Sequence, residues 1–305
     1  MEPVESTQNG PVVATTQFRH GSFPLAREAL GSVSPCLQFW SGRKTAALPD
    51  AMSKNVRRLV CRVSHLEGAT PEVWLLRLQS MIEGGLFDWH AGQYASVRFD
   101  GQEPRDYSIA NRPGEGFAEF HIRHVGGDGA SGYVASGLAE GERVEVQGPF
   151  GEAWFRRDHP GPVLAVAGGT GLAPMKAVIE DALATGLERD VHLYYGCRDE
   201  REIYLERYFI DLARRHPWFR FVSVLSDARP EDDPGRRRGL VGEAVAADFQ
   251  GLAGFDCYLA GPPPMVDAVM DMLLTKGATS ERLFTDAFRT EAEMQALDLP
   301  RPVWD

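Results

Sequence analysis

The chain has 305 residues, 43% of them hydrophobic, which is enough for a sizeable core and for about two domains. Lysine and arginine total 32 against 43 aspartates and glutamates, and the net charge of −11 argues against nucleic acid as a partner. The four cysteines are far apart and form no metal- or cluster-binding spacing, so no metal site is expected. No apolar run is long enough to span a membrane and no secretory signal is visible, so we expect a cytoplasmic protein without membrane insertion.

The first segment, residues 1–54, is rich in Ser, Thr, Gly, Pro and Ala and has no sustained period. This composition predicts a flexible leader, with at most a short helix near 25–30. A slight basic excess in this part of the chain could contact an acidic partner, but it is also typical of a solvated tail.

Residues 55–157 have the pattern of an antiparallel β-barrel. Apolar residues alternate in short stretches separated by Gly or Pro, which predicts strands at 58–64, 73–78, 94–99, 107–110, 118–124 and 143–147. One helix, from about Ser131 to Ala135, is expected to interrupt these six strands.

From 158 to 290 the pattern changes to alternating strands and helices. Strands are predicted at 163–167, 191–195, 219–225 and 257–260, and helices at 174–185, 205–215, 241–247 and 264–276. Such alternation predicts a parallel sheet with helices on both faces. We expect a charged surface loop at 227–238 and a short tail at 291–305.

A glycine turn, Gly168-Gly169-Thr170-Gly171, follows the first strand of the second domain. Three glycines in four residues allow backbone N–H groups to approach a phosphate, and Pro174 could occupy the first position of the following helix. Neither the G-x-G-x-x-G fingerprint nor the Walker A pattern is met. Alone, the turn could equally be a plain strand-to-helix connection.

Two segments of the first domain carry further polar groups. In Arg105–Ser108 (RDYS), the Arg can neutralise a diphosphate, the Tyr can stack on a flat cofactor and the Ser hydroxyl can hydrogen-bond a ring nitrogen. In the second segment, 126–131 (GGDGAS), Ser131 is expected to cap a short helix. Taken singly, Arg105–Ser108 could be an ordinary surface strand, and 126–131 could be a structural helix cap without a ligand.

Together and in this order, these segments resemble the ferredoxin–NADP reductase superfamily over about 55–290. Arg105, Tyr107 and Ser108 match its R-x-Y-S flavin motif, and Ser131 matches the serine of the helix that points at the flavin diphosphate. The further matches are the domain-closing 148–151 (GPFG), the nucleotide loop 168–171 with Pro174, the second nucleotide contact at 196–198 (GCR), 261–265 (GPPPM) and the terminal 284–288 (FTDAF).

The resemblance implies FAD as the cofactor and NADH or NADPH as the electron donor. It implies catalytic roles for Ser108 and for Phe288, whose ring would lie on the flavin. The residues it assigns to cofactor binding are Arg105, Tyr107, Ser108, Ile122, Arg123, Ala130, Ser131, Gly169, Thr170, Gly171, Gly196, Arg198, Gly261, Pro262 and Phe288.

The most similar subgroup comprises the reductases of bacterial ring-hydroxylating dioxygenases and related oxygenases, which act in aromatic hydrocarbon catabolism. Many of them carry a fused [2Fe–2S] domain, but the C-x4-C-x2-C spacing is absent here. The resemblance therefore implies that electrons pass to a separate iron–sulfur ferredoxin or oxygenase component.

The nucleotide preference rests on charges near the adenine end. Arg198 and 236–238 could hold the 2′-phosphate of NADPH, whereas Glu200 and Glu202 favour NADH, which is the donor we expect.

Two alternatives stay open: a reductase of freely diffusing flavin, and a catalytically silent flavin- or nucleotide-binding regulator. The second draws on Ala260, where relatives place a cysteine, and on Asp128, where they place a glycine.

Overall fold

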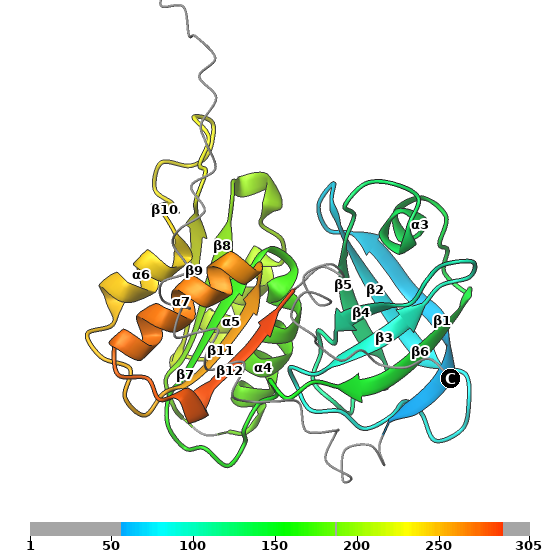
Figure 1. The fold of residues 1–305 in the computed structure, drawn as a ribbon, viewed down its shortest axis with the longest axis horizontal. Coiled ribbons are helices and arrows are strands. Elements are labelled where there is room, and N and C mark those ends of the chain that lie inside the picture. Colours follow the sequence, from blue (N-terminus) through cyan, green and yellow to red (C-terminus); the bar gives the residue numbers. More distant parts are fainter. Residues whose placement is uncertain (1–55, 187, 289–305) are drawn as a thin grey trace, which may run out of the picture.

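The computed structural model describes residues 56–186 and 188–288, which form a barrel followed by a parallel-sheet domain (Figure 1). The expected leader, its short helix and the tail lie outside these residues. No described helix has the length and apolar character needed to cross a membrane.

Six antiparallel strands form the barrel, as predicted. They are β1 (Arg57–Gly68), β2 (Val73–Ser80), β3 (Tyr94–Arg98), β4 (Arg105–Ser108), β5 (Ala118–Arg123) and β6 (Arg143–Phe150), in the order β4-β3-β6-β1-β2-β5. A bridge between Ile109 and Phe120 joins β4 to β5 and closes the sheet. The inward side chains, among them Cys61 and Phe120, form a fully buried apolar core.

Helix α3 (Ala130–Ser136) lies between β5 and β6, close to the predicted position. The prediction that Ser131 caps it is wrong, because the N-cap is Gly129 and Ser131 lies in the first turn. The Ser131 hydroxyl instead accepts a hydrogen bond from the Val125 amide at 3.5 Å. The extended backbone that a cap requires is taken by the glycine two residues earlier.

The second domain is a six-stranded parallel sheet in the order β10-β9-β8-β7-β11-β12. Its strands are β7 (Val163–Gly168), β8 (Val191–Cys197), β9 (Phe219–Leu225), β10 (Arg237–Arg238), β11 (Asp256–Gly261) and β12 (Leu283–Ala287). Its longer helices are α4 (Leu172–Ala184), α5 (Glu206–Arg215), α6 (Val241–Asp248) and α7 (Pro263–Thr275), with 3₁₀ turns η1 (Gly169–Gly171), η2 (Glu200–Glu202) and η3 (Ser280–Arg282).

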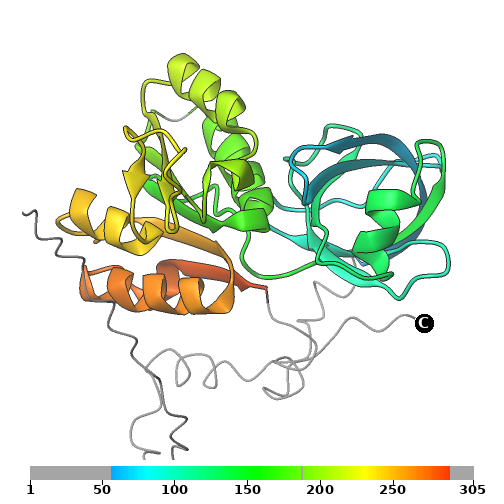
Figure 2. The same ribbon diagram turned by 90° about the horizontal axis from the view of Figure 1, so that it is seen from above.

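Helices α4 and α5 cover one face of this sheet, and α6 and α7 cover the other (Figure 2). Helix α4 begins at Leu172, so the expectation that Pro174 opens it is wrong; η1 carries the chain directly into the helix two residues earlier. Two strands were not predicted. Strand β12 adds an outer edge, and β10 pairs with β9 within the expected loop 227–238.

Helix α4 also forms the contact with the barrel. Val73, Leu75 and Ala91 of the barrel share one buried apolar cluster with Met175 and Ile179 of α4. Helix α4 therefore packs both on its own sheet and on the barrel.

Candidate functional site

The carboxyl ends of β7, β8 and β11 lie side by side, because the three strands are neighbours and parallel. This brings together three predicted segments: Gly169–Gly171 after β7, Gly196 and Arg198 at the end of β8, and Gly261 with Pro262 at the end of β11. In an open parallel sheet, ligands bind outside this edge.

Glycine is required where these loops pack together. A Cβ on Gly171 would lie 2.1 Å from the carbonyl oxygen of Ala260, and one on Gly168 would lie 2.5 Å from the sulfur of Met265. Gly261 has a φ of +142°, and its Cβ would lie 2.9 Å from the Gly168 carbonyl oxygen. Gly169 differs, since it has a φ of +55° and its Cβ position meets nothing within 4 Å. The loop is thus packed tightly against β11 and α7 on one side and is open at Gly169 on the other. This arrangement fits a backbone that approaches a phosphate.

A cavity of about 390 Å³ opens in front of Gly169 and Thr170, between the two domains. The barrel contributes its β1–β2 turn and Arg123, and the parallel-sheet domain contributes the ends of β8 and β9. The lining residues are Thr70, Pro71, Glu72, Val73, Arg123, Gly169, Thr170, Arg198, Asp199, Arg201, Glu202, Tyr204, Asp227 and Arg229.

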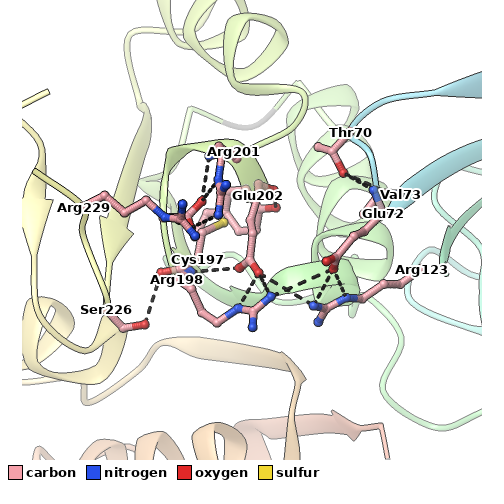
Figure 3. A network of polar contacts seen from close by, with 12 residues as sticks. Thr70, Glu72, Val73, Arg123, Cys197, Arg198, Arg201, Glu202, Ser226 and Arg229 are labelled. Atoms are coloured by element: carbon pink, nitrogen blue, oxygen red, sulfur yellow. Dashed lines mark hydrogen bonds and ion pairs between the residues drawn. The ribbon is translucent and has the colours of Figure 1, made fainter. Parts of the chain in front are cut away.

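Charged side chains from both domains meet across this cavity (Figure 3). Arg123 donates to Glu72 at 2.8 Å within the barrel, and Arg198 pairs closely with Glu202 within the second domain. Each arginine also faces the glutamate of the other domain, Arg123 at 3.7 Å from Glu202 and Arg198 at 4.0 Å from Glu72. Two guanidinium groups therefore line the same cavity as Gly169 and Thr170, and guanidinium groups bind phosphates well.

Strand β4 lies next to the end of β12 on the barrel side of the junction. The buried Ser108 donates a hydrogen bond from Oγ to Oδ2 of Asp286 at 2.9 Å. Burial, aided by the nearby Asp106, raises the pKa of Asp286 to about 6. A carboxyl group that titrates near neutrality beside a serine hydroxyl can accept or release a proton at this position.

Phe288 follows β12, and its amide donates to the Gly261 carbonyl oxygen at 3.0 Å. Phe288 is 37% exposed and is thus one of the large apolar residues on the described surface. Gly261, Asp286 and Phe288 thus connect the predicted nucleotide loops to the predicted flavin strand.

The other flavin-side residues occupy two neighbouring regions. Arg105 is exposed at the start of β4, while Tyr107 is half-buried and burial raises its pKa to about 12. Ile122 points into the barrel core, so only its backbone could reach a ligand, and Ala130 is buried at the start of α3.

The glycine loop before α3 has room for a ligand. Cβ atoms on Gly126, Gly127 and Gly129 would meet nothing within 4 Å, and a cavity of about 400 Å³ lies beside the loop. His124 lines this cavity, and its buried Nδ1 has no hydrogen-bond partner. An open glycine loop and an unpaired polar atom fit a diphosphate-containing cofactor such as FAD, although Asp128 also lines this cavity.

Sequence reasoning named most of these positions but assigned no role to Asp286 or Glu72. The signal for Asp286 was an acidic residue two positions before Phe288, in a segment with no other charged residue. Nothing in the sequence pairs Glu72 with Arg123, since the contact joins residues 51 positions apart.

Two family descriptions match the chain in the predicted order: "Oxidoreductase FAD-binding domain" over residues 60–155 and "Oxidoreductase NAD-binding domain" over 165–271. The chain is 35% identical over 280 residues to a Ralstonia protein, the ferredoxin–NAD(P)⁺ reductase component of naphthalene 1,2-dioxygenase/salicylate 5-hydroxylase systems. The match covers 92% of this chain and 82% of that protein. The corresponding naphthalene 1,2-dioxygenase system reductase of Pseudomonas putida is 32% identical, over 84% of this chain and 77% of that one.

Solved structures agree with this similarity. The Amycolatopsis cytochrome P450 reductase GcoB aligns with a TM-score of 0.71 at 33% identity, covering 76% of this chain and 70% of GcoB. A ferredoxin reductase in carbazole 1,9a-dioxygenase aligns with a TM-score of 0.70 at 26% identity, covering 80% and 71%. The chain therefore belongs to the ferredoxin reductase family of NAD(P)H oxidoreductases, with an FAD-binding barrel followed by an NAD-binding domain.

Proposed function

We propose that the protein is the reductase component of an oxygenase system in aromatic hydrocarbon catabolism. It takes electrons from NADH and passes them through FAD to a separate [2Fe–2S] ferredoxin or oxygenase component. We assign 55–157 to FAD binding and 158–290 to nucleotide binding, and place the protein in the cytoplasm. The observation that carries the proposal is the junction at which Asp286 accepts a hydrogen bond from Ser108, while Phe288, two residues later, donates to Gly261, because these bonds connect the nucleotide loops to the flavin strand.

Bound FAD would supply the redox chemistry, since a flavin accepts a hydride and releases electrons singly. The chain's own residues hold and shield it. Arg105 would neutralise the diphosphate, Tyr107 would pack on the ring system, and Phe288 would cover the ring face until the nicotinamide replaces it. Ser108, held by Asp286, would present its hydroxyl to the reacting end of the ring.

The dinucleotide would lie along the carboxyl edge of the parallel sheet. Amides of Gly169 and Thr170 would face its diphosphate, with Arg198 and Arg123 as counter-charges. Both arginines would exchange carboxylate partners for phosphate oxygens, which keeps their charge balanced.

The charges near the adenine end favour NADH. Arg236 pairs with Glu200 and Glu206, and Arg237 pairs with Asp248 at 2.6 Å. Asp199 accepts from both Arg201 and Arg229, and Asp227 adds a negative charge to the cavity. A 2′-phosphate would compete with these carboxylates, whereas the 2′-hydroxyl of NADH can donate to one of them.

An anaerobic absorbance experiment on the gel-filtered protein tests the proposal. We expect retained flavin that NADH bleaches within seconds, NADPH bleaches far more slowly, and an added [2Fe–2S] ferredoxin reoxidises. Loss of flavin on the column would favour a reductase of diffusible flavin. Retained flavin that neither nucleotide bleaches would favour a binding protein.

A further inference from the structure

A group of charged side chains is buried where α4 of the NAD-binding domain meets β5 of the FAD-binding barrel. Lys176 of α4 and Glu119 of β5 are at its centre, with side chains only 10% and 2% exposed, and their charged atoms are 3.1 Å apart. Ionic groups this deeply buried are uncommon and need complete pairing to be tolerated.

Lys176 uses all three of its N–H donors. They reach the Glu119 carboxylate at 3.1 Å, the Glu180 carboxylate at 2.9 Å and the Ala110 carbonyl oxygen at 3.1 Å. Burial alone would lower the pKa of Lys176, but Glu119 and Glu180 hold it above its ordinary value. The side chain is therefore a cation fixed at three points, two of them in the other domain.

Glu119 is equally well satisfied. It accepts from Arg77 at 2.7 Å, from Lys176 and from His121 at 3.2 Å. Burial lowers the pKa of His121, so its ring is neutral, and Nε2–H donates to the carboxylate. The other ring nitrogen then accepts from the Tyr204 hydroxyl at 3.0 Å, which is a second link between the domains.

The position of Lys176 in the chain matters as much as its pairing. It lies on the first turns of α4, directly after the glycine turn η1, which is the proposed nucleotide loop. Its acceptor Ala110 comes two residues after Ser108, and the Ala110 amide donates to the Glu119 carbonyl oxygen at 2.7 Å. One side chain thus connects the segment that faces the nicotinamide nucleotide to the segment that faces the flavin.

We infer that Lys176 is a positioning residue for hydride transfer, which holds the nucleotide loop and the flavin strand at their reacting separation through Glu119 and Ala110. The inference rests on the proposed transfer from NADH to FAD and assigns it a geometric determinant outside both cofactor sites. Interfaces between domains usually permit relative motion. Because reacting groups must be held within a fraction of an ångström, a loosened junction slows the chemical step more than it weakens binding.

Anaerobic stopped-flow reduction of the FAD-loaded Lys176→Met variant by NADH tests this inference, with wild type in parallel. We expect a limiting reduction rate lower by about tenfold to a hundredfold, with a nearly unchanged NADH dissociation constant and full flavin content. The control is Asp181→Asn on the same helix, which breaks the ion pair between the buried Asp181 and the exposed Arg157, another link from α4 to 55–157, but one that reaches neither Ser108 nor Ala110. It should reduce at the wild-type limiting rate.

A structural readout independent of turnover is hydrogen exchange. In Lys176→Met, the amides of 108–111 and 169–176 should exchange faster together, whereas Asp181→Asn should leave 108–111 unchanged. If Lys176→Met is too unstable to purify, the double variant Lys176→Met/Glu119→Gln is used in its place, because it removes both of these buried charges and leaves neither without its partner.

Three outcomes would overturn the inference: a wild-type limiting rate in the lysine variants, an effect confined to the dissociation constant, or recovery of the rate in the double variant as its stability recovers. The proposed function is judged separately, on the wild-type protein, since it fails if the flavin is not retained or if NADH does not reduce it.

Discussion

Asp286 shows how one side chain links chemistry to stability. Its pKa is raised to about 6, chiefly by burial, so folding favours the protonated form. A raised pKa means that the carboxyl group contributes stability below its unfolded value of 3.8 and loses that contribution as the pH rises through about 6.

Asp286→Asn should therefore raise the thermal midpoint relative to wild type more at pH 7.5 than at pH 4.5. The gain in unfolding free energy from Asp286→Asn should be about 1–2 kcal/mol larger at pH 7.5 than at pH 4.5, as measured by calorimetry of the flavin-loaded proteins. Asp88→Asn, at an exposed position of the barrel, is the control and should alter the midpoint little at either pH. Equal effects of Asp286→Asn at both pH values would show that Asp286 titrates as an ordinary aspartate.

Asp227 carries the second prediction at this scale. It follows β9 and lines the cavity in which the dinucleotide is proposed to bind. Asp227→Ser should raise kcat/KM for NADPH by about tenfold, or about 1.4 kcal/mol, and change the value for NADH little, because only NADPH brings a 2′-phosphate near the carboxylate. Steady-state ferricyanide reduction with both nucleotides measures this. A rise of the same size for NADH would mean that Asp227 opposes the diphosphate shared by both.

At the scale of elements, the turn η1 depends on the absence of a side chain at one residue. Gly171→Ala would place a methyl group 2.1 Å from the Ala260 carbonyl oxygen, so η1 must move away from β11. We expect a loss of about 1–3 kcal/mol in unfolding free energy and weaker NADH binding. Thermal melts and NADH titration test this against Gly251→Ala, whose nearest neighbour would be the Lys276 carbonyl oxygen at 3.8 Å. A Gly171→Ala protein as stable as this control would contradict the close packing.

Most elements could be predicted from the sequence because their signals are local. Alternating apolar residues identified all six barrel strands, and apolar runs between turns identified β7, β8, β9 and β11. Strand β12 was missed because Thr285 and Asp286 interrupt its apolar pattern, and its pairing with β11 is a tertiary contact. The start of α4 was placed late because Pro174 looks like a first helical residue, although η1 already provides that turn.

The site was predictable as a set of motifs but not as a set of contacts. Local residue types identified the glycine turn and the RDYS segment. The bond from Lys176 to Ala110 joins residues 66 positions apart, and no periodic pattern marks either of them. Likewise, Ser108 and Asp286 are 178 positions apart and meet only when the two domains dock.

At the scale of the whole molecule, the buried ionic group should couple the stabilities of the two domains. Burial alone would raise the pKa of Glu119, but His121, Lys176 and Arg77 hold it well below its usual range. A lowered pKa means that this carboxylate contributes stability above its unfolded value of 4.5 and loses it as the pH falls further.

Glu119→Gln should therefore lower the thermal midpoint at pH 7. The difference in midpoint between the variant and wild type should become smaller as the pH falls below about 4.5. Removing one member of a buried charged group costs about 3–5 kcal/mol, so calorimetry should resolve the effect. The matched variant is Glu145→Gln, whose carboxylate pairs with Arg58 and Arg98 on the partly exposed outer face of the barrel. A pH-independent deficit would mean that Glu119 is not held as a carboxylate in the folded protein.

Strand β12 has a consequence for how such proteins can be recombined. Its hydrogen bonds belong to the parallel sheet, yet it brings Asp286 to Ser108 of the barrel. The barrel thus receives a contact from the last strand of the second domain. A chimaera that joins the barrel of one reductase to the nucleotide domain of another should therefore keep the last strand that matches its barrel. Otherwise the barrel and that strand, which meet at the proposed point of electron exchange, will come from different proteins.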